Sequence, residues 1–404
     1  MTKRRSQGTR ALLEEMGSLE GIAETAPDIS GRGVRVVNIV LDRIRPDPAQ
    51  PRRVLPEPIR SEFLAGHLNA RQALERWEAL VAEEAARLGR PRPDWRALLE
   101  RNPDDRNAET FETDPPGTPG PEEELLRSIV ATAATIRHGG QVSPITVVEM
   151  DNGSYFRIET GERRYWAHHW LNMWLSNGFD QIQCIVVPAA SPWRQAAENT
   201  SREELSAIAL ARQLARLLLD LYGIRPDYSR PIPNDWYRQA LEYRVPRGEG
   251  DALRAALGGI QRAQFSRIQA LLRLPDSVWE LADRYRLEEK RLRYVLKVDD
   301  EALQVQLVRL IVTRNLSAER VRQLVESGQL PAILRGAAPP ADEERATVSE
   351  RVASRWPTLA RQVTQADLSL VADQWVKRQK PDEVRQQIAA LRRLLEIVEQ
   401  RVQK

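Results

Sequence analysis

The chain has 404 residues, of which 42% are hydrophobic, and a formal net charge of +3. A chain of this length and composition can bury more than one core, so we expect two or three domains. Its single cysteine excludes an internal disulfide framework. No apolar run predicts a membrane span or a secretory signal, so we expect a cytoplasmic protein. The small positive charge is compatible with nucleic acid but does not require it.

The first part of the chain combines a flexible tail, one strand and a long insertion. Residues 1–33 are polar, basic and broken by glycine, which predicts a flexible tail. Alternating β-branched residues predict a strand at 34–40, and prolines at 46, 48 and 51 then impose an extended turn. Within residues 58–120, a helical stripe of apolar residues predicts a surface for packing or for a partner. The stripe consists of Leu74, Trp77, Leu80, Val81 and Leu88.

The next segment predicts a small mixed sheet with helices packed on it. Pro121 and three glutamates are typical of a helix start, and Gly139 with Gly140 of its end. Strands are predicted at 145–149, 155–159 and 182–187, and Cys184 in the last of them is expected in the core. A helix at 162–174 packs on the sheet through a face formed by Ala167, Trp170, Leu171 and Trp174.

The most informative string is Thr-Gly-Glu-Arg-Arg-Tyr-Trp-Ala at 160–167. Here a strand enters a glycine turn and then a helix that carries Arg163 and Arg164. Free N–H groups and the positive end of the helix dipole favour an anion, and guanidinium groups supply forked, permanently charged donors. The loop at Gly140 can bring backbone close to the same ligand. The string therefore indicates a phosphate site.

A second polar string, Glu198-Asn199-Thr200-Ser201-Arg202, supports two interpretations. Ser201 with Glu204 three residues later forms a capping box, which would open a helix at 202–219. Glu198 and Asn199 also offer hard oxygen ligands suited to Mg²⁺ on nucleotide phosphates, and Arg202 can add a phosphate contact. We favour nucleotide binding, and the two interpretations are compatible.

Residues 251–272 predict a helix-turn-helix, with helices at 251–257 and 261–272 joined by two glycines. The second helix turns Phe265, Ile268, Leu271 and Leu272 inward. It leaves polar residues outward that can reach the major groove: Arg262, Gln264, Arg267 and Gln269. Between 261 and 297, nine basic residues stand against five acidic ones, a net of +4 that suits a phosphate backbone. An ordinary helical hairpin is the alternative.

The C-terminal part predicts a linker and then a helix with an apolar seam. The seam residues alternate in steps of four and three: Val384, Ile388, Leu391, Leu395, Val398 and Val402. Such spacing is typical of a coiled coil and predicts a dimer. A helix packed on its own domain is the alternative, because the run is shorter than three heptads.

Four strings in a fixed order, at 38–52, 139–145, 160–167 and 198–205, together resemble the ParB family, the CTP-dependent DNA clamps of chromosome and plasmid partitioning. The resemblance runs from about 34 to 328 and is interrupted by the insertion at about 58–120. It continues through residues 267–280, which are similar to the family's recognition helix. Two departures are Ser201, where the family has Gln, and a C-terminal segment without the family's strands.

The resemblance implies an α+β protein with a basic tail at 1–33. A small mixed-sheet, ParB/sulfiredoxin-like nucleotide domain follows at 34–190, and an all-helical helix-turn-helix domain at 191–335. A linker at 336–347 then leads to a helical dimerisation segment at 348–404.

The resemblance also implies a DNA-segregation function: binding to a centromere-like DNA site and closure as a sliding clamp with CTP and Mg²⁺. Glu162 and Glu198 are the carboxylates tied to slow CTP hydrolysis, with Glu198 and Asn199 on the metal. The implied nucleotide-binding residues are Gly140, Gln141, Ser143, Gly161, Arg163, Arg164, Asn199 and Arg202. The implied DNA-binding residues are Arg262, Gln264, Arg267, Gln269 and Arg273. Arg10 in the tail corresponds to the contact with a ParA-type ATPase.

These implications predict a nucleoid-associated homodimer in the cytoplasm, acting as a switch. Two other classes of protein stay open. A plasmid-type transcriptional repressor would use the same helix-turn-helix without CTP. A ParB-like nuclease or a sulfiredoxin-like phosphotransferase would need a dense acidic cluster or a reactive cysteine, and neither stands near these strings.

Overall fold

The computed structural model describes residues 35–102, 119–175, 178–202, 205–328, 330–334, 388–389, 391–393, 395–396 and 401. The chain divides into two compact units, Met1–Leu330 and Pro331–Lys404. None of the described helices is long and apolar enough to cross a membrane.

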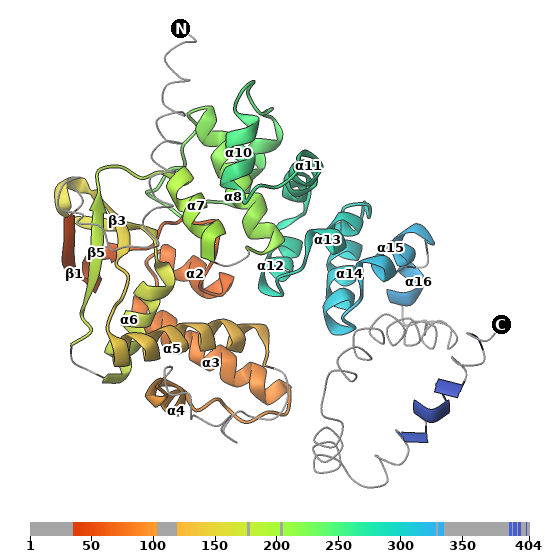
Figure 1. Ribbon diagram of the computed structural model, residues 1–404, viewed down its shortest axis with the longest axis horizontal. Helices are drawn as coiled ribbons and strands as arrows, with labels where there is room; N and C mark the ends of the chain where they lie inside the picture. Colours follow the sequence, from red (N-terminus) through yellow and green to blue (C-terminus); the bar gives the residue numbers. More distant parts are fainter. Residues whose placement is uncertain are drawn as a thin grey trace. The chain divides into compact units, whose positions relative to one another are not determined.

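A five-stranded mixed sheet forms the first layer of the larger unit (Figure 1). Its strands are β1 (Arg35–Val40), β2 (Ile44–Arg45), β3 (Ile145–Met150), β4 (Tyr155–Thr160) and β5 (Gln181–Val187), in the order β1-β5-β3-β4-β2. β3 runs antiparallel to β4 and parallel to β5. The four predicted long strands are therefore confirmed, and β2 was not predicted. β2 has only two residues, which pair with Phe156 and Arg157 of β4, so tertiary contact decides its structure.

Helices α5 (Pro121–Gly139) and α6 (Glu162–Leu175) pack on each other, and α6 also packs on β3 and β5. Ala167, Trp170 and Leu171 of α6 are fully buried, as predicted. The prediction for Trp174 was wrong, because this side chain is 38% exposed. It lies near the end of the helix, where it contacts Trp170 at the edge of the core.

The insertion contributes α2 (Glu57–Leu64), α3 (Ala70–Arg87) and α4 (Trp95–Glu100). α3 packs against α5 and α6, and Figure 1 shows it lying alongside α5. Leu74, Trp77 and Val81 are fully buried in this contact, whereas Leu88 follows the end of α3 and is 54% exposed. The predicted packing surface is confirmed, and the insertion extends the core of the sheet domain.

The rest of the larger unit is helical. Its helices, in chain order, are α7 (Pro192–Arg202), α8 (Ala207–Leu221), α9 (Asn234–Arg238), α10 (Gly250–Ala256), α11 (Arg262–Ala270), α12 (Asp276–Arg284), α13 (Glu289–Val295), α14 (Glu301–Thr313) and α15 (Ala318–Glu326). A short helix, α16 (Leu330–Leu334), begins at the last residue of this unit and continues into the second. Short 3₁₀ turns lie at η2 (Leu41–Arg43), η3 (Asp151–Gly153), η4 (Gln239–Leu241) and η5 (Leu271–Arg273). α8 is almost completely buried and contacts α7, α9, α10, α11 and α12, so it is the central helix of this part.

The predicted capping box at Ser201 was wrong. Ser201 lies inside α7, which already begins at Pro192, and the next helix begins at Ser206, whose side chain accepts a hydrogen bond from the Ala209 amide. Ser191 and Pro192 hold the capping and first positions of α7, and proline at that position needs no amide partner. α7 therefore begins ten residues, or almost three turns, before the predicted start at residue 202.

Little of the predicted dimerisation segment falls within the described residues. Residues 388–389, 391–393 and 395–396 are helical, and Leu395 of the predicted seam is 47% exposed. Val384, Val398 and Val402 lie outside the described residues, as does Arg10 in the tail.

Candidate functional site

The turn between β4 and α6 can be formed only by glycine. Gly161 has φ +94°, and a Cβ there would lie 2.6 Å from Ile145 Cγ2 and 3.2 Å from Arg164 Nη2. β4 therefore passes directly into α6, and Arg163 and Arg164 fall in its first turn. The free amides at this helix start favour an anion.

Arg164 links this turn to the loop that precedes β3. Its Nη1 atom donates to the carbonyl oxygens of Ser143, at 2.5 Å, and Pro144, at 2.7 Å. Its Nη2 atom lies 3.8 Å from Glu198 Oε1, so the guanidinium also faces the second polar string. Arg164 thus has a structural role in addition to its charge.

Helix α7 is fastened to the end of β4 through Glu159. The Glu159 carboxylate accepts the Ser191 amide at 2.8 Å and Arg194 Nη2 at 2.9 Å, and its carbonyl accepts Gln195 Nε2 at 2.7 Å. This contact fixes the first turn of α7. Glu198 and Asn199 lie one turn further along and consequently face the Gly161 turn.

The two strings meet in one cavity of about 320 Å³, which is within the range typical of small-molecule sites. Its lining comprises Gln50, Arg52, Val54, Thr132, Gly161, Glu162, Arg163, Arg164, Glu198 and Asn199. We call it the nucleotide cavity. The structure therefore brings together five of the residues expected at the phosphates and metal, and the expected catalytic Glu162, from segments almost forty positions apart.

Asn199 has a defined orientation in this cavity. It is 6% exposed, and its Nδ2 atom donates to Gln213 Oε1 at 3.0 Å. With the amide nitrogen held by α8, the side-chain oxygen is the atom directed elsewhere. Together with the Glu198 carboxylate it provides the hard oxygen donors that Mg²⁺ prefers, so these two residues could hold the ion.

Glu162 lies in the first turn of α6 and lines the same cavity. Burial raises the pKa of its carboxyl to about 7, although a hydrogen bond from Trp166 Nε1 at 3.1 Å and the charges of Arg60 and Arg52 act to lower the pKa. Desolvation outweighs these partners, so a substantial fraction of Glu162 is neutral at physiological pH.

The loop residues Gly140, Gln141 and Ser143 do not line the nucleotide cavity. Gly140 ends α5 with φ +75°, and Gln141 pairs with the backbone of Gln183 in β5 through hydrogen bonds of 2.8 and 2.9 Å. The loop supports the cavity indirectly, because Ser143 anchors Arg164. Arg202 is the last residue of α7, and the position of its side chain lies outside what the structure describes.

Arg52 was missed as a site residue. It lines the nucleotide cavity and also two neighbouring cavities. The sequence did point to this residue, because Gln50-Pro51-Arg52 belongs to the string at 38–52 that resembles the ParB family. What sequence reasoning lacked was the path of the proline turn, which brings this loop beside α6.

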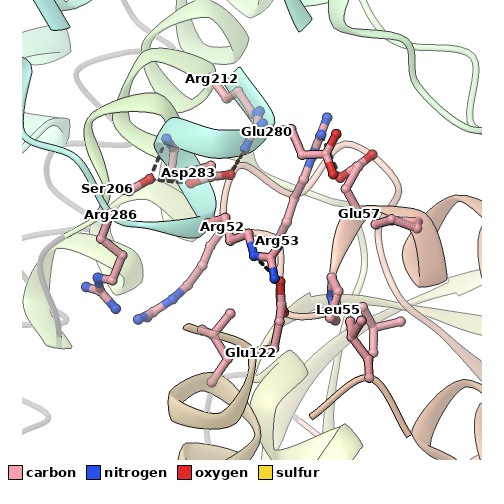
Figure 2. Close-up of a pocket in the computed structure, with 16 residues that line it drawn as sticks. Arg52, Arg53, Leu55, Glu57, Glu122, Ser206, Arg212, Glu280, Asp283 and Arg286 are labelled. Carbon is pink, nitrogen blue, oxygen red and sulfur yellow. Dashed lines mark hydrogen bonds and ion pairs between the residues drawn. The ribbon is translucent and has the colours of Figure 1, made fainter. Parts of the chain in front are cut away.

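A charged junction joins the proline turn to the helical part (Figure 2). Arg212 of α8 is fully buried and pairs with Asp283 of α12, which also accepts the Ser206 hydroxyl. Arg212 Nη1 lies 3.4 Å from the Pro51 carbonyl oxygen, and Arg216 Nη2 lies 2.9 Å from Asp47 Oδ2. The loop that carries Arg52 is thus fixed by α8, the helix that also holds Asn199.

The predicted helix-turn-helix consists of α10 and α11, and its inward residues are buried as expected: Phe265, Ile268, Leu271 and Leu272. Arg262 and Arg267 on α11 and Arg273 in η5 are exposed, and Gln264 is partly exposed. Gln269 differs, because its Nε2 atom donates to the Ala240 carbonyl at 3.0 Å. That bond holds it against the domain. Arg267 is also near a partner, because its Nε atom lies 3.8 Å from Glu289 Oε1, but its side chain is still 46% exposed.

Residues 253–329 match the family described as the ParB HTH domain. The chain is also 27% identical over 206 residues to the nucleoid occlusion protein of Geobacillus thermodenitrificans, covering 50% of this chain and 62% of that protein. Residues 253–329 of this chain therefore form a ParB-type HTH domain.

Other relatives carry the same description. The nucleoid occlusion protein of Bacillus licheniformis is 24% identical, with 61% of this chain and 73% of that protein covered. The protein of Listeria innocua is 29% identical, with 48% and 58% covered. The matches therefore span about three fifths to three quarters of these relatives. None of the three is described as a segregation protein.

One solved structure similar to this chain is that of the C-terminally truncated chromosome-partitioning protein ParB from Caulobacter crescentus, complexed with CTP-gamma-S. It is 15% identical and covers 69% of this chain and 99% of that one, with a TM-score of 0.20. At this TM-score the likeness supports no statement about the residues of this chain.

Proposed function

We propose that this ParB-family protein binds a specific DNA site through α11 and binds CTP with Mg²⁺ in the nucleotide cavity, closing as a sliding clamp on DNA. The observation that carries the proposal is the convergence of Arg163, Glu198 and Asn199 on one cavity at a helix start. The choice of CTP among nucleotides rests on the family resemblance.

In this proposal each part of the cavity has a separate task. The α6 amides and Arg163 bind the triphosphate, and Arg164 orders the adjacent loop. Glu198 and Asn199 hold Mg²⁺, which would offset phosphate charge when bound. Glu162 lies in the same turn as the phosphate donors, where it can orient water for the slow hydrolysis that resets the switch.

The cellular role has two candidates within the same mechanism. Segregation, with a ParA-type ATPase contacted through Arg10, is implied by the resemblance. Nucleoid occlusion is supported by the names of the relatives. Both roles place a homodimer on the nucleoid. Depletion in the native host separates them: cells without DNA indicate segregation, and septa formed across DNA indicate nucleoid occlusion.

Footprinting tests the clamp itself. Once the DNA site has been found by immunoprecipitation, protection should spread beyond it on DNA with blocked ends when CTP and Mg²⁺ are present. Arg163→Ala should protect the site but not spread, because the helix-turn-helix is separate from the cavity. Protection confined to the site in wild type, with or without CTP, would contradict the clamp and favour a repressor.

A further inference from the structure

A second cavity lies at the opposite end of β4 and shares no lining residue with the nucleotide cavity. Its volume is about 730 Å³, which is large enough for a small organic ligand. The start of β4, α6, the loop after α8 and the end of α2 form its walls. Because α2 belongs to the insertion, the insertion supplies one wall of this cavity, to which Phe63 and Leu64 contribute.

Arg157 is the buried charged residue in the lining of this cavity. It lines the cavity from β4, is only 7% exposed, and its guanidinium lies 3.6 Å from the centre of the Tyr228 ring. Its Nη1 atom is buried and has no hydrogen-bond partner among the described residues. A buried cation without a counter-charge is costly, since desolvation is offset only by a well-placed partner.

The other buried arginines of the described chain show what Arg157 lacks. Arg60 lies 3.4 Å from Glu57, Arg216 lies 2.9 Å from Asp47, and Arg212 pairs with Asp283. Each of these three has a carboxylate from the protein, and the described residues supply none to Arg157. Its ring contact with Tyr228 compensates only part of the charge.

Most of the remaining lining residues are aromatic or neutral, and the exceptions are the exposed residues Asp42, Arg45 and Arg230. Tyr155, Tyr165 and Phe63 line the cavity together with Tyr228, and such faces suit a planar ring. Burial lowers the pKa of the His169 imidazole to about 3, so this side chain is uncharged at neutral pH. Its Nε2 atom is buried without a hydrogen-bond partner among the described residues. The buried part of the lining therefore offers one positive charge, that of Arg157, and a set of ring surfaces.

We propose that this cavity binds a small organic anion in which a carboxylate or phosphate group is attached to a planar ring. Arg157 is the charge partner of the anionic group, and Tyr228 contacts the ring. The site is distinct from the nucleotide cavity, so this inference does not rest on the proposed function.

Calorimetric titration of the full chain with benzoate and with phenyl phosphate tests the proposal and distinguishes the two anionic groups. Arg157→Met should weaken binding by about thirtyfold or more, because it removes one partner of a buried charge pair. Arg43→Gln is the matched control: it changes an exposed arginine that lies over the Phe156 ring and outside the cavity lining, and it should leave the affinity unchanged.

Two further variants test whether the probes bind in this cavity and whether the ring contact contributes to binding. Arg163→Ala should bind both probes as wild type does, which separates this cavity from the phosphate site. Tyr228→Leu should weaken benzoate but not acetate, and this result stands even where Arg157→Met does not fold. The proposal is overturned if neither probe binds wild type saturably, or if Arg157→Met or Tyr228→Leu binds benzoate as tightly as wild type.

Discussion

At the scale of single residues, the nucleotide cavity combines strong phosphate donors with a carboxyl group whose pKa is raised. Glu162 lies beside Arg163 in the first turn of α6, yet burial raises its pKa to about 7. A negative charge at this position would repel a triphosphate, and protonation removes that charge. Mg²⁺ would have the same effect by offsetting charge in the cavity.

This residue predicts a pH dependence of nucleotide binding without Mg²⁺. Affinity should rise as the pH falls from 8 to 6, because Glu162 becomes neutral across its pKa of about 7. Glu162→Gln should bind more tightly than wild type at pH 8 and show a shallower dependence, since only the phosphate then titrates. Equal slopes for the two proteins in calorimetry would contradict the assigned pKa.

The residue Arg267 makes a separate prediction for DNA. Arg267→Ala should weaken binding to the specific site by about 1–3 kcal/mol, because an exposed arginine on the recognition helix loses its groove contact. Nucleotide affinity should not change. Arg309→Ala, which alters an exposed arginine on α14, should bind DNA as wild type does in fluorescence anisotropy. Unchanged DNA affinity in Arg267→Ala would remove this residue from the interface.

At the scale of elements, the insertion is held to the sheet domain by a continuous apolar contact. Trp77 is fully buried between α3 and α5, and its Nε1 atom donates to the Glu122 carbonyl at 3.3 Å. Gly120 provides room at the start of α5 for the Glu84 carboxylate of α3, which accepts the Glu123 amide at 3.4 Å. The insertion therefore both packs on α5 and caps it.

Truncation of this contact should destabilise the chain. Trp77→Ala is expected to lower the free energy of unfolding by about 3–5 kcal/mol, through lost burial and the cavity that remains. Leu88→Ala is the control, because that side chain is 54% exposed and its loss should cost little. Urea denaturation followed by circular dichroism compares the two, and equal effects would show that the insertion does not share the core.

Helix α8 is the second element that carries a large stability effect. Arg212→Met should cost about 3–5 kcal/mol, because Asp283, whose side chain is only 18% exposed, loses its charge partner. Burial would raise the pKa of Asp283, but Arg212 and Ser206 lower it below its usual value. The pair therefore stabilises the protein above the unfolded carboxyl's pKa, and this stability is lost as the pH falls. Arg71→Met, in an exposed pair with Glu75, should show almost no loss in urea denaturation.

The limits of sequence reasoning are also clearest at this scale. The spacing of apolar residues and the residues that start or end a helix predicted α3, α5, α6 and α11, because each has an apolar stripe and a clear start or end. The boundary between α7 and α8 was misplaced, since Ser201 with Glu204 imitates a capping box while Ser191 and Pro192 are the real start. Arg52 and the second cavity depend on contacts between distant segments, which local patterns do not encode.

At the scale of the whole molecule, one chain of polar contacts connects the nucleotide cavity with the helix-turn-helix. Asn199 donates to Gln213 on α8, and Gln213 Nε2 lies 3.5 Å from the Ala256 carbonyl oxygen at the end of α10. A ligand that reorients Asn199 would therefore act on a residue shared with the DNA-binding part. Such coupling is reciprocal, so DNA would change nucleotide affinity by the same factor.

Calorimetric titration with each of the four nucleoside triphosphates and Mg²⁺ tests the central claim most directly. Wild type should bind CTP selectively, and Arg163→Ala should bind it about tenfold or more weakly, because a charge-assisted phosphate contact is lost. Arg96→Ala, which changes an arginine whose side chain is 78% exposed on α4, should match wild type. If no nucleotide binds, or if Arg163→Ala binds CTP as wild type does, the cavity is not the nucleotide site.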